Sequence, residues 1–209
     1  MKIFIATILL SVATCSLLAS RTDPSTSGRW ASEMDGWYLE KKTDWNLAGA
    51  KGATFTPDGR QAVISLTNGG LAFVDLRDQR IRHVLDFSLL VGHDDSRPQS
   101  VAVSPMGMVA AAFPERHEVI LIDRTRMRIS ERIKTAFPPR QVRFSAQGKY
   151  LFIGNSSSSH TWPAIYSVLR KQYLLSRIEP MVADMSRDDR YLYLYDPAKN
   201  SVRWLVSDT

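Results

Sequence analysis

The chain has 209 residues, of which 44% are hydrophobic and 23% are charged, a globular composition that excludes a disordered chain. Its single cysteine, Cys15, lies in an apolar N-terminal stretch, which leaves the rest of the chain without an intramolecular disulfide or a thiolate metal site. The net charge of +6 is compatible with nucleic acid, anionic lipid or an acidic protein as partner.

The N-terminus has the features of a secretory signal peptide. Lys2 is followed by an apolar run from Ile3 to Leu18, too short to span a bilayer comfortably, and then by a polar stretch from Ser20 to Gly28. We therefore expect a signal peptide at residues 1–20, a polar linker at 21–35 and the folded part at 36–209. Export to the periplasm or the medium argues against nucleic acid as a partner.

The sequence offers two alternative sites for cleavage of the signal peptide. Cleavage near Ala19 or Ser20 is preferred and gives a periplasmic or secreted protein. The segment Val12-Ala13-Thr14-Cys15 resembles a lipoprotein box, which would make Cys15 a lipid anchor. Thr14 departs from the small residue of that box, and the residues after Cys15 are still apolar. Contact with a membrane is expected only if Cys15 is lipidated.

Four later segments repeat one pattern: an alternating strand that ends in Ser or Thr, a tight turn, a second strand, a polar gap and a third strand. The segments begin at Ala53, Val101, Val142 and Val182. Their turn residues, which recur every 41 to 48 positions, are Gly59, Gly107, Gly148 and Asp189. A period in the forties with several short strands is typical of a propeller blade.

The strands themselves are short and rich in β-branched and aromatic residues. They are expected at residues 62–66, 71–76, 119–122, 150–153 and 191–195. Several are almost continuously apolar, which suits sheets packed on both faces. The prediction is an all-β fold, a β-propeller of about four blades near residues 53–98, 99–139, 140–180 and 181–209, the last completed by 36–47.

The runs Tyr150 to Asn155 and Tyr191 to Pro197 resemble the YVTN repeat, as do the turns Thr56 to Gly59 and Ser104 to Gly107. This resemblance extends over residues 50–209. It departs from the pattern in the second repeat, which has Met108 to Ala112 in place of an aromatic opening, and the Tyr-Val-Thr-Asn tetrad is never intact. The resemblance implies a propeller; exported proteins with such repeats include lactone hydrolases and subunits that support redox cofactors.

The sequence does not determine how the ring of blades closes. Gly36 to Glu40 would supply a missing fourth strand of the last blade, and Trp45 and Trp204 are expected to pack there. Proteins with this repeat generally have seven blades. Half a ring that pairs with another copy or with a partner is therefore an alternative, and a truncated gene product is another.

The sequence contains loops that are candidate binding sites, but no convergent set of catalytic residues. His93-Asp94-Asp95 lies in a long connection and is a candidate partner contact. A histidine and two carboxylates can also hold a metal, but three adjacent residues do not converge on one ion, and a solvated loop is preferred. Met106 and Met108 are assigned to packing. Ser156 to Pro163, with His160 and Trp162, is the loop expected to contact a partner.

The basic run Arg124, Arg126 and Arg128 has two interpretations. If Arg126 and Arg128 lie on one strand, they share a face, which would form a patch for an acidic protein or anionic lipid. The favoured interpretation is a charged outer edge strand that resists pairing with other sheets.

The composite prediction is an exported, non-catalytic binding scaffold of the cell envelope without cofactor or metal, whose partner is a protein or a second copy. The alternative is a propeller enzyme, or an accessory subunit of a lactonase-like or redox enzyme. Asp75, Asp123 and His93 would be its candidate residues, but Asp75 and Asp123 end equivalent strands and are better explained as turn residues.

Overall fold

The computed structural model describes residues 49–87, 97–155, 163–176, 182–196 and 199–206, to which every structural statement below refers. Their regular structure is β-strand, apart from the 3₁₀-helix η1 (Pro114–Arg116). The described part contains no helix long and apolar enough to cross a membrane. The predicted signal peptide with Cys15, the linker, Trp45 and the segment Gly36 to Glu40 lie outside the described residues.

Fifteen described strands form four antiparallel sheets, in which each strand pairs with the next along the chain. The first sheet comprises β1 (Ala50–Phe55), β2 (Gln61–Leu66), β3 (Gly70–Asp75) and β4 (Arg80–Asp86). The second comprises β5 (Ser100–Val103), β6 (Met108–Phe113), β7 (Glu118–Asp123) and β8 (Arg128–Lys134). The third comprises β9 (Gln141–Phe144), β10 (Tyr150–Gly154), β11 (Ala164–Ser167) and β12 (Gln172–Ser176). The fourth comprises β13 (Val182–Met185), β14 (Tyr191–Asp196) and β15 (Ser201–Val206).

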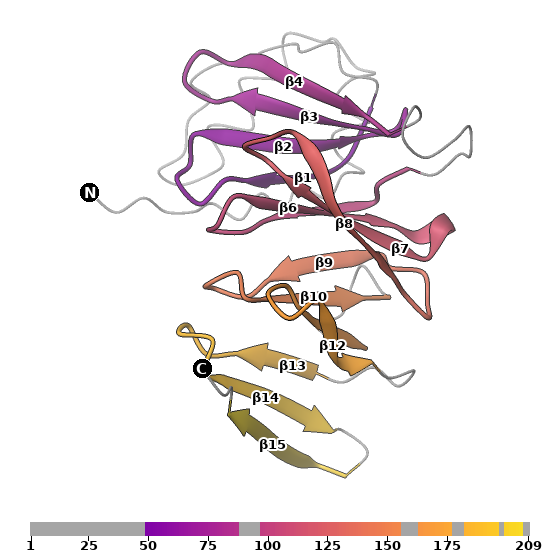
Figure 1. Ribbon diagram of the computed structural model, residues 1–209, viewed down its shortest axis with the longest axis vertical. Coiled ribbons are helices and arrows are strands. Elements are labelled where there is room, and N and C mark those ends of the chain that lie inside the picture. The colour runs from indigo at the N-terminus through magenta and orange to yellow at the C-terminus, as the bar shows by residue number, and fades with distance from the viewer. Residues whose placement is uncertain (1–48, 88–96, 156–162, 177–181, 197–198, 207–209) are drawn as a thin grey trace, which may run out of the picture.

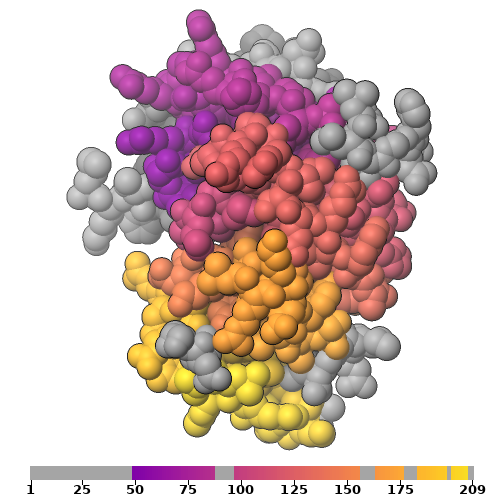
Figure 2. Space-filling view, viewed as in Figure 1, coloured from indigo at the N-terminus to yellow at the C-terminus, as the bar shows by residue number. Residues whose placement is uncertain are grey.

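The four sheets stack one after another along the long axis of the molecule (Figure 1). β1 lies against β5, and β5 against β9, so the first strands of successive sheets are neighbours, as in propeller blades. Figure 2 shows the same order on the surface, with the first sheet at one end and the fourth at the other. The described sheets therefore form an open array of four blades.

The second and third blades each pack one apolar face against the blade before and the other against the blade after. Val63 and Phe73 of the first blade pack with Val109 and Ile120 of the second. The next two seams are built in the same way. One joins Ala110 and Leu121 to Leu151, Ile153 and Ala164, and the other joins Phe152 and Ile165 to Ala183, Leu192 and Leu194. Burial on both faces explains why these strands are almost continuously apolar.

A hydroxyl and a left-handed residue fix the hairpin between the first two strands of every blade. In the third blade the Ser145 hydroxyl accepts a hydrogen bond from the backbone N–H of Tyr150 at 3.0 Å, and Gly148 has a φ of 76°. The equivalent hydroxyls belong to Thr56, Ser104 and Ser186, and the equivalent left-handed residues are Gly59, Gly107 and Asp189. All four turn residues predicted from the repeats are confirmed.

Candidate functional site

Asp75 and Asp123 stabilise the turns after the third strands of their blades. Asp75 accepts a hydrogen bond from the backbone N–H of Arg77 at 2.9 Å, and Asp123 accepts one from that of Thr125 at 2.9 Å. The Thr125 hydroxyl and the Arg126 guanidinium also bond to Asp123, and these bonds hold its pKa well below the usual range. Both carboxylates are therefore engaged in their own turns.

The same place in the other two blades is filled by Ser167 and Asp196. Their side chains accept hydrogen bonds from the backbone N–H groups of Arg170 and Lys199, each at 3.3 Å. The recurrence in all four blades supports the interpretation of Asp75 and Asp123 as turn residues. His93, the third candidate of the enzymatic alternative, lies outside the described residues.

The arginine run does not form one strand face. Arg124 and Arg126 lie in the turn before β8, which begins at Arg128, and Met127 has a left-handed backbone with a φ of 49°. Arg126 bonds to Asp123 at 2.8 Å, while Arg124 donates to the side-chain oxygen of Gln61 in the first blade at 2.9 Å. The prediction of a shared face is wrong for Arg126 because the chain reverses direction between it and Arg128.

The outermost strand of the second blade agrees with the charged-edge interpretation. β8 exposes Arg128, Arg132 and Lys134, while the alternate Ile133 is buried. Charged side chains on such an edge oppose pairing with another sheet. Arg128 therefore belongs to a solvated edge and not to a recessed site.

The structure also contains a buried acid that the sequence analysis did not single out. The carboxylate of Glu118, at the start of β7, lies 3.2 Å from Arg116, 3.6 Å from Arg132 and 3.6 Å from Lys134. Alternation places Arg132 and Lys134 on the same face of β8, so the sequence did contain a signal for part of this cluster. The three cations balance the buried charge and tie η1 to the outer edge of the blade.

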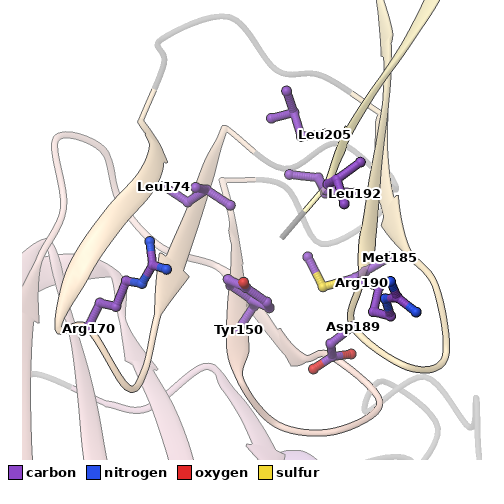
Figure 3. Close-up of a pocket in the computed structure, with 9 residues that line it drawn as sticks. Tyr150, Arg170, Leu174, Met185, Asp189, Arg190, Leu192 and Leu205 are labelled. Atoms are coloured by element: carbon purple, nitrogen blue, oxygen red, sulfur yellow. The ribbon is translucent and has the colours of Figure 1, made fainter. Parts of the chain in front are cut away.

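A pocket of about 130 Å³ opens at the seam between the third and fourth sheets (Figure 3). Tyr150 stands between Arg170 and Arg190 in this view, and apolar side chains close the rest of the wall. Those apolar residues are Leu174, Met185, Leu192 and Leu205, and Val206, the last residue of β15, also lines the pocket. The pocket is smaller than the roughly 300–1,000 Å³ of most small-molecule sites, so it has room for a side chain or a small ion.

The carboxylate that borders this pocket is already satisfied. Asp189 is fully buried, and its carboxylate accepts hydrogen bonds from the Ser145 hydroxyl at 2.6 Å and from the backbone N–H groups of Gln147 and Lys149, each at 3.3 Å. All three donors belong to the hairpin turn of the third blade. Asp189 is therefore a clamp between two blades, because its carboxylate accepts three hydrogen bonds from the neighbouring turn.

The outward face of the fourth sheet, by contrast, is apolar and exposed. Strand register places Tyr191 opposite Val206, Tyr193 opposite Trp204, and Tyr195 opposite Val202. We call this set of six residues the end face. Tyr193 is 43% exposed and Trp204 is 67% exposed. No described strand covers Trp204 on this face. The predicted closing strand, Gly36 to Glu40, lies outside the described residues, so the packing of Trp204 in a closing blade stays a prediction.

The two central positions of the end face are buried in every other blade. Phe152 and Ile165 of the third blade correspond to Tyr193 and Trp204, because each pair lies cross-strand at the centre of its blade, and both are fully buried against the fourth sheet. Val63 with Phe73, and Ala110 with Leu121, are the equivalent buried pairs of the first two blades. The end face thus has the construction of an interface between blades, without a blade upon it among the described residues.

The remaining predicted contact residues, His93, Asp94, Asp95, His160 and Trp162, lie outside the described part of the chain. Within the described part there is no group of three or more His, Cys, Asp or Glu side chains that could hold a metal ion.

Solved propeller structures share this architecture. The Kuenenia stuttgartiensis hydrazine synthase aligns with a TM-score of 0.56 and 20% identity over 82% of this chain and 53% of that one. The WD40 repeats of RRP9 align with a TM-score of 0.55 and 12% identity over 79% of this chain and 53% of that one. The predicted all-β propeller architecture is confirmed, and at these identities the likeness shows the fold alone.

The chain spans about half the length of the solved chains it matches. No protein-family model matches it, and no curated protein matches its sequence.

Proposed function

We propose that this chain is an exported, non-catalytic protein-binding module of the cell envelope, built from YVTN-like propeller repeats. The observation that carries the proposal is the exposed end face. Tyrosine and tryptophan are enriched at the centres of protein interfaces, since they bury a large apolar area while their polar atoms find partners. Contiguous apolar patches on a protein surface mark interaction sites.

Export is supported by the residues at the N-terminus, where Lys2 precedes an apolar run and a polar stretch. The periplasm or the medium is therefore the proposed location, with a lipid anchor at Cys15 as the alternative.

The enzymatic alternative lacks a supporting observation in the described residues. Asp75 and Asp123 are hydrogen-bonded within separate turns of separate blades, and Asp189 is bonded to a neighbouring turn. Acid–base catalysis needs side chains that converge on one substrate position.

Site-specific photo-crosslinking tests the proposal. A photoreactive amino acid replaces Trp204 in the full chain, in the cells that produce it, and a matched variant carries it at Leu169, which is 65% exposed in the β11–β12 turn. We expect protein adducts from position 204 and few from position 169, with the chain recovered from the periplasm or the medium. The absence of protein adducts at position 204 would contradict the binding role, and retention in the cytoplasm would contradict export.

A further inference from the structure

We infer that the end face binds the end face of a second copy of this chain around a two-fold axis. The inference rests on the proposed protein-binding function and names its partner. Three features of the described residues carry it: the difference between the two ends of the array, the pattern of side chains on the end face, and its area.

The two ends of the array differ in the exposure of their outward apolar faces. In the first sheet, the face that would receive a preceding blade contains Ala62, Ile64, Ala72 and Val74, and all four are at most 7% exposed. The end face, at the opposite end, is open. A head-to-tail stack of copies needs both faces free, whereas a two-fold pair needs only the end face.

The end face is complementary to itself. Three tyrosines follow one another along β14, and β15 presents Val202, Trp204 and Val206 beside them. Rotation by 180° about an axis along the strands, between β14 and β15, places the tyrosine row of each copy over the valine and tryptophan row of the other. Tyr191 and Tyr195 then face valines, and Tyr193 faces Trp204, so that large side chains pack on smaller ones at both edges and aromatic rings meet at the centre.

Charge does not oppose this pairing at its centre, and the Arg190 guanidinium, 5.9 Å from the centroid of the Tyr191 ring, lies at its edge. On the described strands of this sheet, register adds Asp184 of β13 to the rim of the end face, opposite Tyr193. Asp184 is paired with Arg143 of the third blade at 2.8 Å. A two-fold pair therefore brings no unpaired carboxylates together at its centre, and depletion of charge is characteristic of interface cores.

The available area fits a reversible dimer. The exposed fractions of Tyr191, Tyr193 and Trp204 amount to roughly 300 Å² of side-chain surface per copy, if a whole aromatic side chain offers 150–250 Å². With the valines and the rim, two copies approach the roughly 1,000 Å² at which specific interfaces begin. We therefore expect association that depends on protein concentration.

Light scattering with size exclusion over a hundredfold range of concentration tests the inference on the purified protein. We expect a mass that rises from one copy to two, and no dimer at the highest concentration for Trp204→Arg or Val202→Arg. Leu169→Arg is the matched control, which adds the same charge at an exposed apolar residue elsewhere and should dimerise like the parent. Circular dichroism identifies a variant that fails to fold. If one end-face variant does not fold, the other tests the dimer. A parent that stays monomeric throughout, or a dimer that tolerates both end-face variants, would overturn the inference.

Cysteine crosslinking tests the two-fold symmetry of the proposed dimer. In a chain with Cys15→Ser, Tyr193→Cys places a single thiol near the proposed axis. A short bismaleimide should join two such copies, whereas in a head-to-tail dimer the two thiols lie on different seams and the product would be absent. In the photo-crosslinking experiment a self-adduct at position 204 agrees with the inference. An adduct with another protein and not with a second copy overturns it while the protein-binding function stands, and the absence of any adduct removes both.

Discussion

The seam between the third and fourth sheets and the end face of the fourth sheet are built from equivalent positions, yet one is core and the other is surface. Phe152 and Ile165 are fully buried, whereas Tyr193 and Trp204 are 43% and 67% exposed. Both pairs are apolar and lie cross-strand at the centre of a blade. The comparison shows that both faces of a blade are apolar, and that a face is buried only where a neighbouring blade packs against it.

The largest expected contrast is between the central residues of the two faces. Phe152→Ala removes a ring that is fully buried against Leu192 and Leu194, and it should lower the free energy of unfolding by about 3–5 kcal/mol. Tyr193→Ala acts on the exposed face and should cost less than about 1 kcal/mol in the monomer. Urea denaturation at low protein concentration measures both. Equal losses would mean that the end face is covered within one chain.

The clamp at the same seam gives the next largest effect. Asp189→Ala leaves the Ser145 hydroxyl and two backbone N–H groups of the third blade without their acceptor, at a cost of about 2–3 kcal/mol in unfolding free energy. Alanine at the φ of 58° adds about 1 kcal/mol of backbone strain, which gives about 3–4 kcal/mol in all. Asp188→Ala is the matched control in the same turn. Asp188 bonds only to Ser186 and Arg190 of its own turn, so its loss should cost under about 1 kcal/mol. A control as damaging as Asp189→Ala would contradict the clamp.

The smallest effect separates backbone strain from contact between blades. Gly148 and Gly59 both have positive φ, so an alanine at either position should cost about 1 kcal/mol of strain. A Cβ at Gly148 would lie 3.1 Å from the Cβ of Ser104 in the second blade, whereas a Cβ at Gly59 meets nothing within 4 Å. Gly148→Ala should therefore be about 1–2 kcal/mol less stable than Gly59→Ala in thermal or urea unfolding. Identical stabilities would show that the seam yields to the extra methyl group.

Much of the fold could be predicted because its signals are local. The hairpin at Ser145 needs a hydroxyl, a left-handed residue and a strand start within six positions, and each is visible in the sequence. The role of Asp75 and Asp123 was likewise readable from their equivalent places at strand ends. The outer strands were predicted less well: the turn at Met127, where a residue other than glycine has positive φ, separates Arg126 from β8 and has no glycine to mark it.

The candidate site could be predicted only in part. Trp204 was identified as a residue of the last blade, but its exposure depends on whether another strand lies in front of it, and that is a property of the assembled sheets. The loops with His93 and Trp162 remain predictions, since they lie outside the described residues.

The repeat, the turns and the two apolar faces of each blade could be derived from the amino-acid sequence, because alternation and turn chemistry act over a few residues. The hydrogen bond between Asp189 and Ser145, 44 positions apart, and the burial of one terminal face while the other is exposed are visible only in the assembled fold. Such outcomes depend on which surfaces meet when whole blades stack, and a pattern within one blade carries no information about the blade beside it.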